Sequence, residues 1–364
     1  MTVDVSAASD EGGRAAGAAA PLLEVRDLRV SYGVGDRSVK AVRGVDFVVR
    51  SGEALGIAGE SGSGKSTLVM SFLRLLPSVA TVTGQVRYHG EDILTMNWGR
   101  VRAVRWAGAS MIFQGAMSAL NPVRSIATQI IEPIMLHEKI GARAARARAA
   151  SLLGDVGLPA ARLDSYPHEL SGGQRQRVMI AMALACGPDL IIADEPTTAL
   201  DVMVQAQILQ LLKDLAASRA IGLIMISHDL SVLAEVCDRL AVMYAGAICE
   251  IGPTEEVRTD PRHPYSAALL DAFPEIGDPT SRRQPHGLPG DPPDATATTP
   301  GCPFLPRCAV AMPSCADHTI ALWPSGPGRL SSCLRVLPEF AGGPTDVDRG
   351  PSAAALMTEP NPGR

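Results

Sequence analysis

The most informative residues of the chain form one glycine-rich run, residues 59–67, with the sequence GESGSGKST. It fits the phosphate-binding loop pattern G-x-x-x-x-G-K-[ST]. Glycines let successive backbone N–H groups face phosphate oxygens, and the following helix adds its dipole. Lys65 is expected to reach the β- and γ-phosphates, and Ser66 to ligate Mg²⁺. The alternative, a chance glycine-rich turn, is disfavoured by the apolar strand before the run and the helix after it.

An apolar run that ends in two carboxylates is the second chemical signal. Residues 190–193 are Leu-Ile-Ile-Ala, and Asp194 and Glu195 follow them. Ligand sites in parallel sheets form beyond the carboxyl ends of strands. Asp194 is therefore expected to hold Mg²⁺, and Glu195 to polarise the attacking water. Taken alone, a strand that ends in a solvated acidic turn explains the pattern equally well.

A second anion-binding helix terminus is predicted at residues 170–174, Leu-Ser-Gly-Gly-Gln. A Ser-Gly-Gly run that opens a helix presents backbone N–H groups and a capping hydroxyl. One chain rarely needs two such sites for one nucleotide. The pair makes sense if two chains face each other and each completes the other's site.

The elements around these motifs predict an α/β fold. Short, continuously apolar strands alternate with helices, which favours a buried, mainly parallel sheet. The expected strands are 54–58, 190–193 and 223–226. The expected helices are 67–76, 142–153, 171–185 and 203–217.

Composition narrows the functional classes. The chain has 364 residues, 46% of them apolar, and a formal net charge of -5. This charge balance argues against a broad nucleic-acid-binding face. No apolar run is long enough to span a membrane, and no signal peptide is recognisable. A cytoplasmic protein is expected, so any transport role would need separate membrane subunits to form the pore.

Residues 170–174 resemble the signature motif of ATP-binding-cassette (ABC) ATPases, and the order of motifs suits that family. The resemblance identifies Gln114 as the Q-loop glutamine, Asp201 as the D-loop aspartate and His228 as the switch histidine that senses the γ-phosphate. Tyr32 stands where the family carries an adenine-stacking aromatic, although a lone Tyr is more often a packing residue. The implied fold is a P-loop cassette with a mainly parallel sheet core, an antiparallel β subdomain and a helical subdomain.

The resemblance implies that two ATP molecules are sandwiched between two cassettes and that hydrolysis lets the sandwich open. The implied catalytic residues are Lys65, Gln114, Glu195 and His228. The implied Mg²⁺ ligands are Ser66, Gln114 and Asp194. The implied nucleotide-binding residues are Tyr32, Gly59, Ser61, Gly62, Ser63, Gly64, Lys65, Ser66, Thr67, Gln114, Ser171, Gly172, Gly173, Gln174, Asp194 and Asp201.

A narrower resemblance, to dipeptide/oligopeptide/nickel importer ATPases, covers about residues 22–334. It rests on Phe113-Gln114 followed by Ala119-Leu120-Asn121-Pro122, on His263-Pro264-Tyr265, and on Gly301-Cys302-Pro303-Phe304 with Pro306-Arg307-Cys308. Gly115-Ala116 depart from that family's usual Asp-Pro. The implied partners are a second ABC ATPase subunit, more often a paralogue than a copy, two membrane permeases and an extracytoplasmic substrate-binding protein. The implied location is the cytoplasmic face of the membrane.

The domains expected from these patterns follow the chain order. Residues 1–21 are expected to be disordered, and 22–270 to form the nucleotide-binding domain. About 95–170 of that domain is the expected helical subdomain. Residues 271–340 are the expected loop-rich C-terminal extension, and 341–364 a disordered tail.

Four of the seven cysteines, Cys302, Cys308, Cys315 and Cys333, lie in the extension with C-x5-C-x6-C-x17-C spacing. This is not the paired C-x2-C spacing of ordinary zinc sites. Four thiolates suit a [4Fe–4S] cluster, and some members of the resembling family carry one here. Zinc is the alternative metal. Four cysteine thiols that bind no metal are the simplest interpretation. The other three cysteines, Cys186, Cys237 and Cys249, are expected in the core.

Two other functions compete with an importer ATPase. A soluble ABC ATPase of DNA repair or translation would usually carry a long coiled-coil insertion or two cassettes, and the sequence shows neither. A regulatory module that binds ATP without turnover would not need Glu195 and His228.

Overall fold

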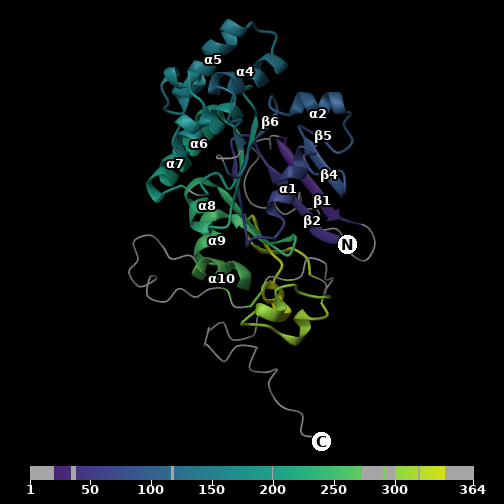
Figure 1. The fold of residues 1–364 in the computed structure, drawn as a ribbon. Helices are drawn as coiled ribbons and strands as arrows, with labels where there is room; N and C mark the ends of the chain where they lie inside the picture. Colours follow the sequence, from purple (N-terminus) through teal and green to yellow (C-terminus); the bar gives the residue numbers. More distant parts are fainter. Residues whose placement is uncertain are drawn as a thin grey trace, which may run out of the picture.

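The computed structural model describes residues 20–33, 38–115, 119–198, 200–272, 288, 290–291, 293, 300–318 and 320–340. They form two β-sheets, flanking helices and a C-terminal extension (Figure 1). The terminal segments expected to be disordered lie outside the described residues, apart from Ala20 and Pro21.

The larger sheet has, within the described ranges, the strand order β11-β12-β10-β9-β3-β8-β7-β6. Every residue of its central strands β3, β8 and β7 is buried. This explains why their sequences are continuously apolar up to the last residues, Asp194 of β7 and Ser227 of β8, and do not alternate. The parallel strands are β6 (Ala109–Ile112), β7 (Leu190–Asp194), β8 (Gly222–Ser227), β3 (Ala54–Ala58) and β9 (Arg239–Tyr244). The predicted parallel core is confirmed.

The two faces of this sheet are covered by different hydrophobic cores. In β8, Leu223 and Met225 enter the core with the helices α6, α7 and α8, whereas Ile224 and Ile226 enter the core with α1 and the smaller sheet. Alternate residues of a strand point to opposite faces, so one apolar run serves both cores. The bounds are α1 (Lys65–Phe72), α6 (Gly172–Ala183), α7 (Val202–Arg219) and α8 (Leu230–Val236).

The smaller sheet is antiparallel, with strand order β2-β1-β4-β5. It confirms the predicted antiparallel β subdomain. Its strands are β1 (Leu23–Tyr32), β2 (Val39–Val49), β4 (Ala80–Tyr88) and β5 (Glu91–Asp92).

A helical arm lies at the end of the molecule opposite the extension (Figure 1). It contains α4 (Ile126–His137), α5 (Ala142–Asp155) and 3-10 turns at Ala160–Asp164 and Pro167–Glu169. The helix α2 (Trp98–Val104) lies instead beside β5 of the smaller sheet, and its Val104 enters the core of that sheet. The stretch expected to be helical, about 95–170, also contains β6. That strand has only four residues, too few for a period to be recognised in the sequence.

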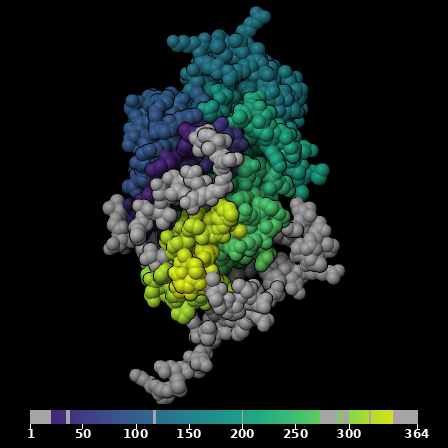
Figure 2. Space-filling model, turned by 180° about the vertical axis from the view of Figure 1, so that it is seen from behind, coloured from purple at the N-terminus to yellow at the C-terminus, as the bar shows by residue number. Residues whose placement is uncertain are grey.

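The C-terminal extension joins the main sheet. β10 (Ala247–Pro253) pairs antiparallel with β9, and β12 (Arg329–Ser331) pairs with β10 through Glu250–Ser331 and Ile251–Leu330. β11 (Trp323–Gly326) follows as the edge strand. The remaining elements are α9 (Thr254–Thr259), α10 (Pro264–Ala272) and 3-10 turns at Leu305–Arg307, Pro313–Cys315, Leu334–Val336 and Pro338–Phe340. Figure 2 shows the extension packed against the preceding part of the chain.

Candidate functional site

The residues predicted to bind and hydrolyse ATP follow neighbouring strands of the main sheet. β3, β8, β7 and β6 are adjacent and parallel, so their carboxyl ends meet at one edge. The phosphate loop follows β3, His228 follows β8, Glu195 follows β7, and Gln114 lies two residues after β6. This is the edge where ligands of open α/β sheets bind.

The phosphate loop is fitted closely against its neighbours. A Cβ at Gly59 would collide with the carbonyl oxygen of Met243, and one at Gly64 with that of Ala41. Both glycines have positive φ angles, of 152° and 100°. The loop's path therefore requires glycine at these two positions.

Lys65 folds back over the loop. Its Nζ donates to the carbonyl oxygens of Gly59 at 2.6 Å and Glu60 at 2.8 Å, and to Ser63 Oγ at 3.3 Å. Burial lowers the pKa of Lys65, while the carboxylates of Glu195, Asp194 and Glu60 oppose this shift. The ammonium group is thus held at the loop by oxygen acceptors that phosphate oxygens can replace.

Ser66 and Asp194 supply oxygen ligands suitable for Mg²⁺. Ser66 Oγ donates to Asp194 Oδ1 at 3.2 Å, which joins the first turn of α1 to the end of β7. Burial raises the pKa of Asp194, and the hydrogen bond from Ser66 opposes that shift. A hydroxyl and a carboxylate side by side fit the hard-ligand preference of Mg²⁺.

Glu195 contacts side chains that follow the ends of the two strands beside its own, β6 and β8. Its Oε2 accepts hydrogen bonds from Gln114 Nε2 at 2.8 Å and Thr198 Oγ1 at 2.9 Å. Its Oε1 lies 3.4 Å from His228 Nδ1. The backbone of Glu195 has a φ of 45°, which is uncommon for a non-glycine residue. The structure therefore brings the predicted residues Gln114, Glu195 and His228 together and adds Thr198, which was not predicted.

Ser171 begins α6 as predicted. Its Oγ accepts from Gln174 N at 3.3 Å, and Gln174 Oε1 accepts from Ser171 N at 3.1 Å, which forms a capping box. Gly173 packs against Val204 of α7 so closely that a Cβ would lie 2.6 Å from Val204 Cγ1. Asp201 caps α7 by accepting from Val204 N at 2.9 Å. Ser171 and Asp201 therefore cap the N-termini of α6 and α7, and these two helices pack against each other there.

Tyr32 ends β1 and is half-buried. Its hydroxyl lies 3.3 Å from Thr67 Oγ1, so it borders the phosphate loop's helix.

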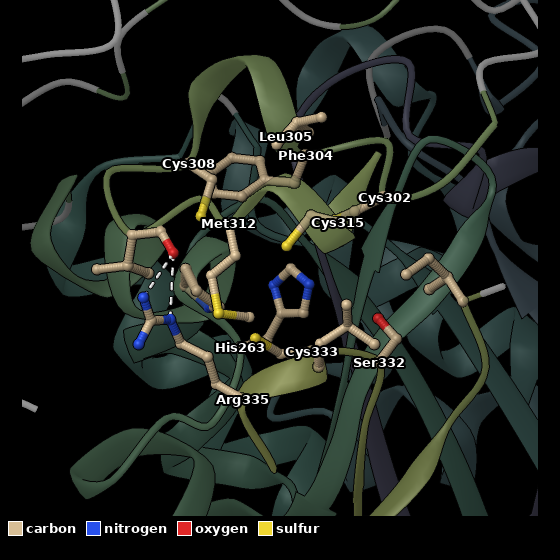
Figure 3. A pocket seen from close by; sticks show the side chains of 14 residues that line it. His263, Cys302, Phe304, Leu305, Cys308, Met312, Cys315, Ser332, Cys333 and Arg335 are labelled. Atoms are coloured by element: carbon tan, nitrogen blue, oxygen red, sulfur yellow. Dashed lines mark hydrogen bonds between the residues drawn. The ribbon is translucent and has the colours of Figure 1, made fainter. Parts of the chain in front are cut away.

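The four cysteines of the extension line one cavity, together with His263, Phe304 and Met312 (Figure 3). Burial raises the pKa of the Cys302 and Cys333 thiols, and raises that of Cys308 to about 11. In the described ranges, no group of three or more His, Cys, Asp or Glu residues is arranged to hold a metal ion. The predicted cluster or zinc site thus gains no direct support, although the thiols converge.

Cys237 and Cys249 are buried in the core as predicted, whereas Cys186 is half-buried and packs against the edge of the core. The described residues contain no helix that is both long and apolar enough to cross a membrane.

A contact from the extension to the phosphate loop has no signal in the sequence and was not predicted. Arg307 donates to the Glu60 carboxylate at 2.7 and 3.0 Å. The two residues are 247 positions apart, and no sequence pattern links them.

Family models match two parts of the chain. The ABC transporter model matches residues 42–198, and the oligopeptide/dipeptide transporter C-terminal region matches residues 249–315. Among solved structures, a dimeric bacterial ABC transporter cassette superposes with a TM-score of 0.58 at 27% identity, covering 64% of this chain and 98% of that one. An ABC transporter component from Clostridium perfringens gives a TM-score of 0.57 at 28% identity, covering 66% and 91%.

Curated relatives match over nearly their full lengths. The oligopeptide transport ATP-binding protein OppD of Salmonella typhimurium is 44% identical over 88% of this chain and 95% of its own. The dipeptide transport ATP-binding protein DppD of Bacillus subtilis is 44% identical over 83% and 94%. A putative peptide import ATP-binding protein of Brucella abortus is 45% identical over 88% and 96%. The chain therefore belongs to the ABC transporter ATP-binding proteins that carry the oligopeptide/dipeptide transporter C-terminal region.

Proposed function

We propose that this chain hydrolyses ATP to drive import of di- or oligopeptides, or of a similar small solute such as nickel, through separate membrane permeases. The observation that carries the proposal is the Glu195 carboxylate, held by Gln114 and Thr198 beside His228 at the edge of the phosphate loop. Such a carboxylate can orient the water that attacks a γ-phosphate. A soluble role in DNA repair or translation is disfavoured because the relatives are transport ATP-binding proteins.

Each residue of the site has a proposed role, and Lys65 and Gln114 belong to both the binding and the catalytic sets. Lys65 and the loop N–H groups hold the phosphates, while Ser66 and Asp194 hold Mg²⁺, with Gln114 able to reach it or the water. The bound ion would neutralise charge on the phosphate oxygens. Glu195 takes the proton of the attacking water, and His228 senses the γ-phosphate.

The site is proposed to be completed by a second cassette. Ser171 caps α6 and is exposed, so its hydroxyl and the helix N-terminus can meet a nucleotide on a facing chain. Asp201 begins the neighbouring helix and can link the two sites. Tyr32 is proposed to stack on adenine. A paralogue is the preferred partner, with two permeases and an extracytoplasmic substrate-binding protein completing the importer.

Replacing Glu195 by Gln tests the catalytic assignment. The amide keeps the shape and the acceptor oxygen but is not a base, so turnover should fall by about 100-fold or more. ATP affinity, measured by calorimetry, should stay within about threefold of the wild type, since the phosphates are held by other residues. Unchanged turnover would contradict the role of Glu195.

We also propose that Cys302, Cys308, Cys315 and Cys333 hold a [4Fe–4S] cluster, with zinc as the alternative. Support comes from their position around one cavity and from the affinity of thiolates for both groups. Bound there, the group would cross-link a segment that has few core residues. Anaerobic purification should yield about four irons per chain. Stoichiometric zinc would favour the alternative, and a metal-free protein would contradict both.

A further inference from the structure

We propose that Arg307 of the C-terminal extension and Tyr265 of α10 are positioning residues that hold the phosphate loop in its nucleotide-binding shape. The inference rests on the proposed function, since it concerns the same ATP site. It adds a role for the C-terminal extension in ATP affinity.

Glu60, the second residue of the loop, is held through both its side chain and its backbone. Its carboxylate accepts two hydrogen bonds from the Arg307 guanidinium, at 2.7 and 3.0 Å. Its backbone N–H donates to the Tyr265 hydroxyl at 2.9 Å. Paired charge-assisted bonds from arginine are among the strongest side-chain contacts and fix orientation as well as distance.

The same residue also contacts the phosphate-binding lysine. Lys65 Nζ donates to the Glu60 carbonyl oxygen at 2.8 Å. The path from Arg307 to Lys65 is therefore two contacts long and passes through one residue. If the Glu60 backbone moves, both the Lys65 ammonium group and the adjacent loop N–H groups move with it.

Arg307 and Tyr265 are both closely packed in the protein interior. The Arg307 side chain is only 4% exposed, and Tyr265 is fully buried. The rings of Tyr244, Tyr265 and Phe304 pack together with centroids 4.5 to 5.4 Å apart. Arg307 lies over the edge of this group, 5.9 Å from the Tyr244 centroid. Packed aromatic groups of this kind keep a side chain in one orientation.

The turn that carries Arg307 is itself part of the cysteine-lined cavity's wall. It spans Leu305–Arg307, and backbone hydrogen bonds tie it to Cys302 before it and Cys308 after it. Figure 3 shows Phe304 and Leu305 beside the two thiols. A rearrangement of this wall would therefore displace Arg307 from the phosphate loop.

The test measures ATP affinity by calorimetry in full-length chains that all carry Glu195→Gln, so that turnover does not interfere. Arg307→Met should weaken ATP binding about tenfold or more, because a bidentate charged contact is lost. Arg307→Lys should recover part of the loss, since it keeps the charge but not the paired geometry. Tyr265→Phe keeps the buried ring and removes only the acceptor, so a smaller weakening of about threefold to tenfold is expected.

Two comparisons separate positioning from general damage. Arg100→Met removes a bidentate pair of the same chemistry with Glu91, at 2.7 and 3.0 Å, on the smaller sheet, and should leave ATP affinity unchanged. Glu60→Gln alone should weaken ATP binding strongly. It should add little to the effect of Arg307→Met, because both substitutions remove the same contact between Arg307 and Glu60. Unchanged affinity in a folded Arg307→Met protein, or full additivity with Glu60→Gln, would overturn the proposal. Failure of the proposed function would appear separately, as absent turnover of the wild-type chain in the complex with its partner subunits.

Discussion

At the scale of single residues, the site depends on how one carboxylate is oriented. Glu195 has a φ of 45° and accepts from two donors on different strand ends. The left-handed backbone costs roughly 1 kcal/mol or more, which the surrounding contacts must offset. Thr198 is three residues away in sequence, and it ties the carboxylate to its own loop.

Thr198→Val tests this orientation. The substitution preserves shape and removes the hydroxyl, so the carboxylate loses one of its two donors. Turnover should fall about tenfold or more with ATP affinity unchanged, because a hydrogen bond from a hydroxyl to a charged carboxylate contributes about 1.5 kcal/mol or more. Thr198→Ser should restore turnover in the steady-state assay. Equal loss in the Ser and Val variants would mean that the methyl group, not the hydroxyl, matters.

At the scale of elements, a buried ion pair joins the extension to the sheet. Glu250 on β10 is completely buried and accepts from Arg329 of β12 at 2.8 Å. It also accepts from the backbone N–H groups of Arg262 and His263, at 2.8 and 2.9 Å. One carboxylate thus fixes β10, β12 and the segment that leads into α10.

Arg329→Met should lower the free energy of unfolding by about 3–5 kcal/mol, because Glu250 would remain buried without its cation. Urea unfolding followed by circular dichroism measures this change. The matched control is Arg146→Met, which removes an exposed pair with Asp164 at 2.7 Å and should cost less than about 1 kcal/mol. A similar small cost for both variants would show that the buried pair does not hold the extension.

At the scale of the whole molecule, the proposed sharing of the ATP site between two cassettes can be tested at the exposed start of α6. Ser171→Arg places a large cation where a facing chain's nucleotide would lie. Turnover should drop about 100-fold in the complex with its partner subunits, whereas ATP affinity of the isolated chain should change less than about threefold. The lost cap should cost about 1 kcal/mol of stability, which a thermal melt can verify. Retained turnover would argue against the shared site.

Local patterns in the sequence were sufficient to predict much of the fold and of the candidate site. The phosphate loop, the strand ending in Asp194 and Glu195, and the Ser171 cap each depend on a few consecutive residues, so they could be predicted. The contact of Arg307 with Glu60 and the pairing of β12 with β10 could not. Both depend on residues that only the tertiary fold brings together, and neither has a periodic or motif-like signal.

The pairing of β12 with β10 also bears on where the chain can safely be divided. The family model for the C-terminal region begins at residue 249, inside β10. A fragment that stops after α10 would leave β10 with an unpaired row of N–H and C=O groups, a template for association between chains. Among the described residues the edge strand on this side of the sheet is instead β11, a four-residue strand with Pro324 and an irregular register. Short edge strands that contain proline resist pairing with strands of other chains. The extension therefore protects the sheet against aggregation by supplying such an edge strand.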